Sequence, residues 1–144
     1  MDIPLSEKIN CFVGENGVGK TNVLDAVHYL GLCKSSLNPI DTQNIRYDQE
    51  FCVVQGVFQR LDKEENILCG IRKNKKKQFK RNQKEYKKLS EHIGLIPLVM
   101  VSPSDNLLIN GGSEERRNFI NGVVAQYSRV YLDNMIQYNH ALSQ

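Results

Sequence analysis

The spacing of apolar residues changes several times along the chain, and each spacing predicts a different element. The short apolar run at residues 8–13 ends directly in a glycine and is typical of a buried strand. Residues 22–30 repeat apolar side chains at helical spacing, which predicts a helix that ends near Gly31. Further on, Asp41 is expected to cap a short helix that runs to Arg46.

The middle of the chain changes to strand-like patterns rich in β-branched and aromatic residues. Three strands are expected, at residues 51–59, 67–72 and 77–82, with charged turns at 62–66 and 73–76. Alternation places Ile67, Cys69 and Ile71 on one face, and Phe79 is expected to point inward. These segments predict an antiparallel meander inserted after the first helix.

The last third returns to helical spacing after one more apolar run. We expect a short helix at 86–93, a buried strand at 95–101, a helix that Ser113 caps, and a second helix from Tyr131. The expected fold class is therefore α/β, with a parallel core, the inserted meander and C-terminal helices. Its parts are a strand and helix (1–49), a basic β subdomain (50–88), and a strand with the start of a helical lobe (89–144).

A glycine-rich loop joins the first strand to the first helix, and its sequence fits the pattern G-x-x-x-x-G-K-[ST] at every fixed position. The loop and the residue after it are Gly14, Glu15, Asn16, Gly17, Val18, Gly19, Lys20, Thr21 and Asn22. Glycines let the backbone wrap closely around a polyphosphate and aim its N–H groups inward. The pattern predicts that Lys20 contacts the β- and γ-phosphates and that Thr21 ligates Mg²⁺. The alternative is a chance glycine turn at a helix start.

Composition adds a class of protein and one unusual segment. Nothing in the 144 residues resembles a signal peptide or a membrane span, and no cysteine pair has metal-binding spacing, so we expect a soluble protein with buried, reduced thiols at Cys11, Cys52 and Cys69. Residues 72–88 hold ten of the 19 Lys and Arg residues against one acid, which leaves a net charge of −6 on the rest of the chain.

This basic segment is a candidate nucleic-acid surface, because clustered cations bind a phosphate backbone by releasing counterions. The candidate contacts are Lys73, Lys75, Lys76, Lys77, Lys80, Arg81 and Lys84. Phe79 and Tyr86 could stack on bases, although Phe79 is expected in the core. The alternative is a solvated edge, since lysines also protect edge strands from pairing.

Other candidate residues leave alternatives open. Asp105 follows the end of the predicted strand, so we interpret it as a loop or helix-capping residue and not as a magnesium ligand. Ser35 and Ser36 are either ligands or caps. The cations Arg116 and Arg117 stand at a helix start, an unfavourable place that suggests a specific partner or a plain surface pair. A guanine-recognition loop is absent, which favours ATP over GTP.

Several motifs together make the chain resemble the RecF family of DNA replication and repair proteins. They are Gly14 to Thr21 followed by Asn22-Val23-Leu24-Asp25-Ala26, then Lys88-Leu89-Ser90, Ser102-Pro103, Gly111-Gly112-Ser113-Glu114-Glu115-Arg116-Arg117-Asn118-Phe119, Tyr131-Leu132, and Tyr138-Asn139 with Ala141-Leu142. The phosphate loop alone is generic, whereas the Gly-Gly-x-x-x-Arg-Arg-x-Phe segment and its place after Ser-Pro are much more particular.

The resemblance implies the first lobe of a P-loop ATPase head similar to ABC and SMC proteins. It further implies ATP and Mg²⁺ at residues 14–22, single-stranded or gapped DNA, RecO- and RecR-like partners, an ATP-dependent homodimer, and a cytoplasmic role in replication, gap repair and the SOS response. The chain is expected to be an N-terminal fragment that does not turn ATP over, because the signature and magnesium-binding acids are missing. The alternatives are another SMC-type head, a non-hydrolysing nucleotide or nucleic-acid binding module, and a metabolic kinase, which is disfavoured.

Overall fold

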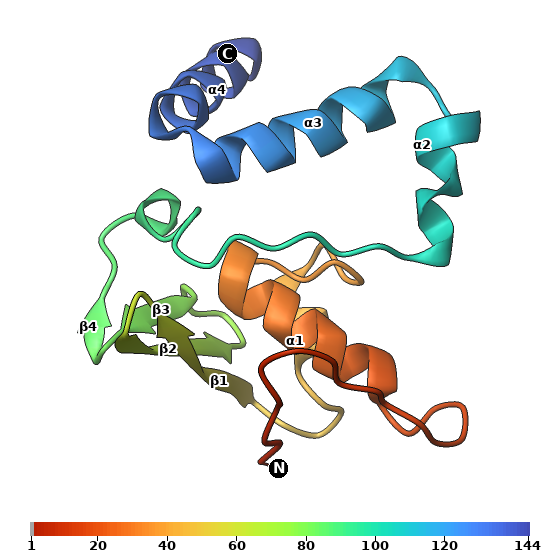
Figure 1. Ribbon diagram of the computed structural model, residues 1–144. Helices are drawn as coiled ribbons and strands as arrows, with labels where there is room; N and C mark the ends of the chain where they lie inside the picture. The colour runs from red at the N-terminus through yellow and green to blue at the C-terminus, as the bar shows by residue number, and fades with distance from the viewer. Residues whose placement is uncertain (1) are drawn as a thin grey trace.

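The structure is a computed structural model that describes residues 2–144. Helix α1 (Lys20–Leu32) packs beside an antiparallel sheet. Three further helices, α2 (Leu107–Asn110), α3 (Ser113–Tyr127) and α4 (Arg129–Leu142), arch over this unit (Figure 1). An extended segment around residues 95–101 runs between the two groups (Figure 1). None of the helices in the described part of the chain is both long enough and apolar enough to cross a membrane.

Helix α1 spans Lys20–Leu32, which confirms the predicted helix and its end near Gly31. The C-cap residue is not Gly31 but Cys33, which adopts the left-handed conformation with φ 58°. Gly31 lies inside the helix, where a Cβ atom would collide with the side chain of Leu98. This glycine therefore allows a close approach between α1 and the 95–101 segment, and it does not cap the helix.

The sheet has four strands in the order β1-β2-β3-β4, namely β1 (Phe51–Arg60), β2 (Lys63–Arg72), β3 (Gln78–Arg81) and β4 (Lys84–Glu85). All neighbours are antiparallel, as the predicted meander requires. The predicted turn at 62–66 is wrong, because Arg60 already pairs with Lys63. Leu61 and Asp62 alone make the turn, and their positive φ values of 47° and 59° match the right-handed twist of the strands.

The core lies between α1 and the inner face of the sheet. Ile67, Cys69 and Ile71 from β2 and Phe79 from β3 are at most 3% exposed, which confirms the predicted inward faces. Tyr29 and Leu30 of α1 pack against them in the same cluster. Cys69 is buried as expected and Cys52 is half-buried, but Cys11 is exposed, which is contrary to the prediction.

The predicted strands at residues 8–13 and 95–101 do not form among the described residues. Ile9, Val13 and Val101 are 85%, 91% and 82% exposed. Instead of pairing in a sheet, Ser6 and Asn10 close a local loop, with the Ser6 N–H donating to Asn10 Oδ1 at 2.7 Å. A strand needs a neighbour that satisfies its backbone N–H and C=O groups, and the sheet found in residues 2–144 includes neither segment.

Two of the other predicted short helices differ from the observed elements. Residues 86–93 contain only a 3₁₀ turn at Leu89–Glu91, because the N–H of Tyr86 bonds to Phe79 O at 3.0 Å and keeps the chain paired with the sheet. The helix expected to run to Arg46 is a 3₁₀ helix, Asp41–Asn44, and Asp41 does not cap it.

The C-terminal part is helical as predicted, with α2 (Leu107–Asn110), α3 (Ser113–Tyr127) and α4 (Arg129–Leu142) after a 3₁₀ turn at Pro103–Asn106. Ser113 is the first residue of α3 and not its cap, which is Gly112. Ser128 does cap α4, since its hydroxyl accepts the N–H of Tyr131 at 3.3 Å.

Candidate functional site

The glycine-rich loop at residues 14–19 is curled and passes directly into α1. Gly17 and Gly19 have φ values of 86° and 99°, in the left-handed region that other residues rarely adopt. A Cβ at Gly17 would meet no atom within 4 Å, so this position requires glycine for its backbone angle and not for space. The observed turn agrees with a loop that wraps around a ligand.

The ammonium group of Lys20 lies over this loop. Its Nζ donates to Gly14 O at 2.8 Å and to Glu15 O at 2.7 Å, so the side chain turns back toward the start of the loop. An ammonium has three N–H donors, and these two bonds leave one available. The loop carbonyls therefore hold a positive charge where the backbone turns.

The start of α1 adds unpaired donors to the same place. Gly19 is the N-cap, no side chain caps it within residues 2–144, and the first turn contains no acidic residue. The first N–H groups of a helix lack intrahelical partners and carry the positive end of its dipole. Glu15, Asn16, Val18, Thr21 and Asn22 are all exposed here. The site is open to solvent and suited to an anion.

Behind the loop, a buried carboxylate on α1 holds the segment that follows the helix. Asp25 accepts hydrogen bonds from Ser35 Oγ at 2.7 Å, from Ser36 Oγ at 2.7 Å and from the Ser36 N–H at 2.6 Å. Burial raises the pKa of Asp25, but these hydrogen bonds outweigh it and keep the pKa below its ordinary value. Ser35 and Ser36 therefore have hydrogen-bond partners within the protein, and neither caps a helix among the described residues.

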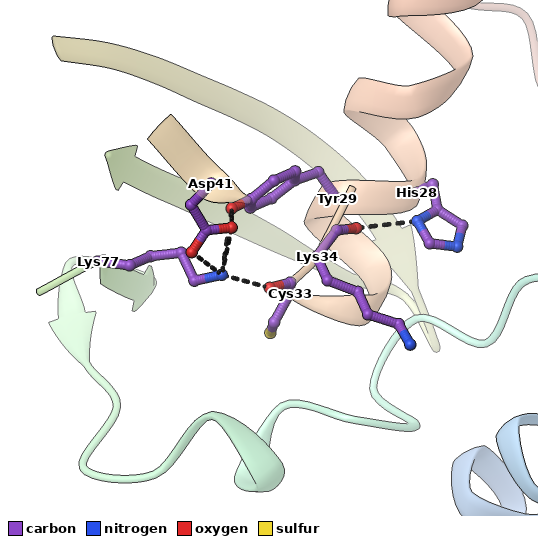
Figure 2. Close-up of polar contacts among 6 residues, drawn as sticks. All are labelled: His28, Tyr29, Cys33, Lys34, Asp41 and Lys77. Carbon is purple, nitrogen blue, oxygen red and sulfur yellow. Dashed lines mark hydrogen bonds and ion pairs between the residues drawn. The ribbon is translucent and has the colours of Figure 1, made fainter. Parts of the chain in front are cut away.

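The opposite end of α1 holds one of the predicted DNA contacts. Lys77 Nζ donates to Cys33 O at 2.7 Å and pairs with Asp41 Oδ2 at 2.9 Å. It also lies 3.1 Å from the hydroxyl of Tyr29, which donates to Asp41 (Figure 2). The Lys77 side chain is only 13% exposed, and its charge lies at the negative end of the helix. Lys77 thus joins the basic segment to α1.

Arg81 has a similar internal partner. Its guanidinium group holds the buried carboxylate of Glu65 through two atoms, with Nε to Oε2 at 2.7 Å and Nη2 to Oε1. The hydrogen bond from Arg81 is the main reason that the pKa of Glu65 is lowered to about 2. Lys77 and Arg81 therefore each serve the packing of the sheet in this structure.

The other five basic candidates lie on the surface. Lys75, Lys76 and Lys84 are exposed, Lys73 pairs with Glu50 at 3.2 Å, and Lys80 is half-buried on β3. The two aromatic candidates do not accompany them, because Phe79 is in the core and Tyr86 is half-buried with its hydroxyl 3.1 Å from His92. A stacking role for Tyr86 is thus not supported, since its ring packs against Phe79 and His92.

Sequence reasoning missed one exposed aromatic residue near these lysines. Phe51 begins β1 and is 60% exposed. The alternation of the strand could have revealed it, because Cys52 and Val54 face the core cluster and Phe51 therefore faces the other side.

Two remaining candidates have local structural roles. Asp105 accepts the backbone N–H of Ser102 at the start of a 3₁₀ turn, which agrees with its interpretation as a loop residue. Arg116 donates to Gly111 O at 3.0 Å, next to the end of α2. The cation at the start of α3 therefore satisfies carbonyl groups of the preceding helix.

Comparison with curated proteins finds close relatives along the whole chain. It is 57% identical over 145 residues to the DNA replication and repair protein RecF of Bacteroides fragilis, and this covers 100% of the chain. It is 50% identical over 137 residues to RecF of Flavobacterium johnsoniae, which covers 95%. The chain spans 39% and 38% of these two relatives. No family model matches the chain.

Comparison with solved structures agrees. A structure of the recombination mediator protein RecF with bound nucleotide, from the RecFOR pathway, superposes with a TM-score of 0.84 and 28% identity over 90% of this chain and 35% of that one. A structure from a study of ATP-driven dimerisation and DNA-stimulated activation of SMC ATPases superposes with a TM-score of 0.66 and 19% identity. The match covers 84% of this chain and 87% of that one. The second likeness shows the fold alone, and together they confirm the predicted P-loop ATPase fold.

Proposed function

This chain belongs to the RecF family of DNA replication and repair proteins, and we propose that its residues 14–22 bind the triphosphate of ATP with Mg²⁺. Lys20 contacts the β- and γ-phosphates, Thr21 ligates Mg²⁺, and the backbone from Gly14 to Asn22 surrounds the phosphates. The curled loop, with left-handed Gly17 and Gly19 before an uncapped helix start, is the observation that supports this assignment most directly.

A nucleotide-binding assay tests this proposal with two variants of the same loop. Titration with a fluorescent ATP analogue in the presence of Mg²⁺ should give saturable binding, which Lys20→Ala weakens at least tenfold. Gly17→Ala should weaken binding as well, because alanine disfavours φ 86°. Lys8→Ala is the matched control, because it removes a lysine outside the loop. Equal affinity of Lys20→Ala and wild type would refute the site.

The DNA part of the proposal uses the five members of the basic segment that lie on the surface, four of them exposed and Lys80 half-buried. Lys73, Lys75, Lys76, Lys80 and Lys84 contact the phosphate backbone of single-stranded or gapped DNA. Lys77 and Arg81 are left out, since their side chains have partners inside the protein. The concentration of positive charge on one hairpin supports this surface, and it carries no sequence preference of its own.

Salt-dependent binding tests the basic surface. Affinity for a gapped oligonucleotide should fall steeply as the salt concentration rises. Replacing both Lys75 and Lys76 with Ala should make the plot of log binding constant against log salt concentration less steep, by the share of about two phosphate contacts. Replacing Lys8 and Lys34 is the matched control, since it removes the same charge from outside the segment. If replacing Lys75 and Lys76 leaves the salt dependence of binding unchanged, the DNA does not bind at this surface.

The remaining parts of the proposal concern the whole protein. We infer an ATP-dependent homodimer, partners similar to RecO and RecR, and a cytoplasmic role in replication, recombinational gap repair and the SOS response. The support is the relationship to RecF proteins and the fold shared with an SMC ATPase. Sedimentation with and without ATP tests the dimer, and a monomer under both conditions would refute it.

A further inference from the structure

A hollow lies on the outer face of the sheet, away from α1, at the end where the chain turns from β2 to β3. It has a volume of about 410 Å³, and its lining includes Phe51, Val53, Gly70, Arg72, Lys75 and Lys76, which we call the outer-face hollow. This volume lies within the range of small-ligand pockets, roughly 300–1,000 Å³. Its lining also includes Cys52, Ile71 and Gln78, of which the first two have side chains on the core side of the sheet, and none of residues 14–22 lines it.

Strand register explains why the hollow is there. Phe51 lies opposite Arg72, and Val53 lies opposite Gly70, so these residues share one face of the sheet. Gly70 has no side chain, and a Cβ at this position would meet no atom within 4 Å. The missing side chain leaves a depression in the outer face, with Phe51 and Val53 on one side and the β2–β3 turn on the other.

The side chains that line the outer-face hollow are partly apolar and partly cationic. Phe51 and Val53 are 60% and 54% exposed and lie at neighbouring positions of one face, so they form an apolar surface open to solvent. Arg72, Lys75 and Lys76 supply three positive charges at the same place, and none has an ion-pair partner among the described residues. An aromatic surface next to cations fits a ligand with a flat ring and a phosphate.

We propose that the outer-face hollow binds one nucleotide of single-stranded DNA, with its base stacked on Phe51 and its flanking phosphates beside Lys75 and Lys76. This inference rests on the proposed DNA binding, and it assigns the base-stacking residue that Phe79 and Tyr86 do not provide. Base stacking on an aromatic side chain is tolerant of sequence, because every base has a π-face.

The hollow distinguishes single strands from duplexes on physical grounds. In a duplex the bases are stacked on each other, so none is free to lie on an exposed ring. The cations bind either form through phosphates, whereas Phe51 adds affinity only when a base is unstacked. The hollow therefore gives the basic surface a preference for single-stranded segments, such as those within a gap.

The test compares two oligonucleotides of equal charge with the intact protein. One is a single-stranded oligonucleotide with normal bases, and the other has abasic residues throughout. Phe51→Ala should lower affinity for the normal strand about five- to one-hundred-fold and leave the abasic strand unchanged. Phe51→Leu, which keeps an apolar side chain without a ring, should behave like Ala, and Phe51→Tyr should behave like wild type.

Each outcome decides between this inference and the proposed function. If Phe51→Ala weakens both strands equally, or neither, the stacking site is wrong, although the basic surface stands as long as Lys75 and Lys76 control the salt slope. If the wild-type protein binds neither strand, DNA binding itself fails. If Phe51→Leu binds as wild type does, the contact is apolar and the stacking assignment is overturned. Circular dichroism checks that each variant is folded.

Discussion

Two apolar segments with similar composition have opposite environments in this structure. Ile67, Cys69 and Ile71 of β2 are buried on the face of the sheet that packs against α1, whereas Ile9 and Val13 are exposed next to the glycine-rich loop. The difference is pairing, because β2 has β1 on one side and β3 on the other. Among the described residues the 9–13 segment has no neighbouring strand. Apolar content therefore does not bury a segment unless its backbone also finds partners.

The 95–101 segment is intermediate between a fully paired strand and an unpaired segment. It passes over α1 at Gly31, and the side chain of Gln126 bonds both backbone groups of Leu98, with Leu98 N–H to Oε1 at 2.9 Å and Nε2 to Leu98 O at 3.1 Å. A side-chain amide thus takes the place of one residue of a neighbouring strand. The segment is anchored at this point, while Val101 further along is exposed.

The largest expected effect separates the buried and exposed segments directly. Phe79→Ala removes a ring that is 1% exposed and should lower the free energy of unfolding by about 3–5 kcal/mol. Val101→Ala, the matched control on an exposed apolar position, should change it by less than about 0.5 kcal/mol. Urea denaturation followed by circular dichroism measures both. Equal losses would show that the 95–101 segment is as well packed as the sheet.

A smaller effect sharpens the comparison within the basic segment. Lys77→Met keeps the length of the side chain but leaves Asp41 and Cys33 O without their cation, and it should cost about 1–3 kcal/mol. Lys75→Met removes an exposed charge from the same turn and should be close to neutral. The same denaturation experiment distinguishes them. A neutral Lys77→Met would mean that the ion pair is not part of what holds the turn to α1.

The smallest effect is a pH dependence of the buried core. His92 is completely buried, with Nε2 2.7 Å from Leu30 O and Nδ1 3.1 Å from Tyr86 Oη, so Nε2 carries the proton and Nδ1 accepts. Burial lowers the pKa of His92, and the positive charge of Arg81 adds to this against the hydrogen bond to Leu30 O. The neutral ring is therefore the form that the folded protein favours.

Because the folded pKa is the lower one, this stabilisation is present above about pH 6.5, the usual histidine value, and is lost as pH falls through the folded pKa. Wild type should lose unfolding free energy in this window relative to His92→Gln, measured by urea denaturation at several pH values. Subtracting the unfolding free energy of His92→Gln from that of wild type at each pH cancels the pH dependence that Asp25 and Glu65 add to both proteins. Parallel pH profiles for the two proteins would contradict the prediction.

Much of the fold could be predicted because several elements have strong local signals. Alternating apolar residues predicted β1 to β3 and the inward face of Phe79, and helical spacing predicted α1, α3 and α4. Errors arose where local patterns were ambiguous. Gly31 resembles a helix C-cap but is needed for contact with Leu98, and Asp41 resembles an N-cap but pairs with Lys77.

For the candidate site, the local backbone geometry could be predicted, but which basic side chains face internal partners and which face solvent could not. The left-handed angles at Gly17 and Gly19 and the turn of Lys20 toward its own loop depend on residues next to one another. The different environments of Lys77, which is enclosed, and Lys75, which is exposed, do not depend on adjacent residues. Neighbouring lysines in one basic run have the same local sequence signal. Only the position of α1 and Asp41 relative to the turn decides which lysine is enclosed.

The amino-acid sequence by itself predicted the glycine-rich loop and the meander, because steric freedom and alternation act over a few adjacent residues, and its motifs indicated the resemblance to the RecF family. The tertiary structure alone decided that the 8–13 run is exposed, that Arg81 and Lys77 face internal acids, and that Phe51 is the aromatic residue beside the free cations. These outcomes depend on which distant segments meet, and the free energy of burial and pairing is defined only after they have met.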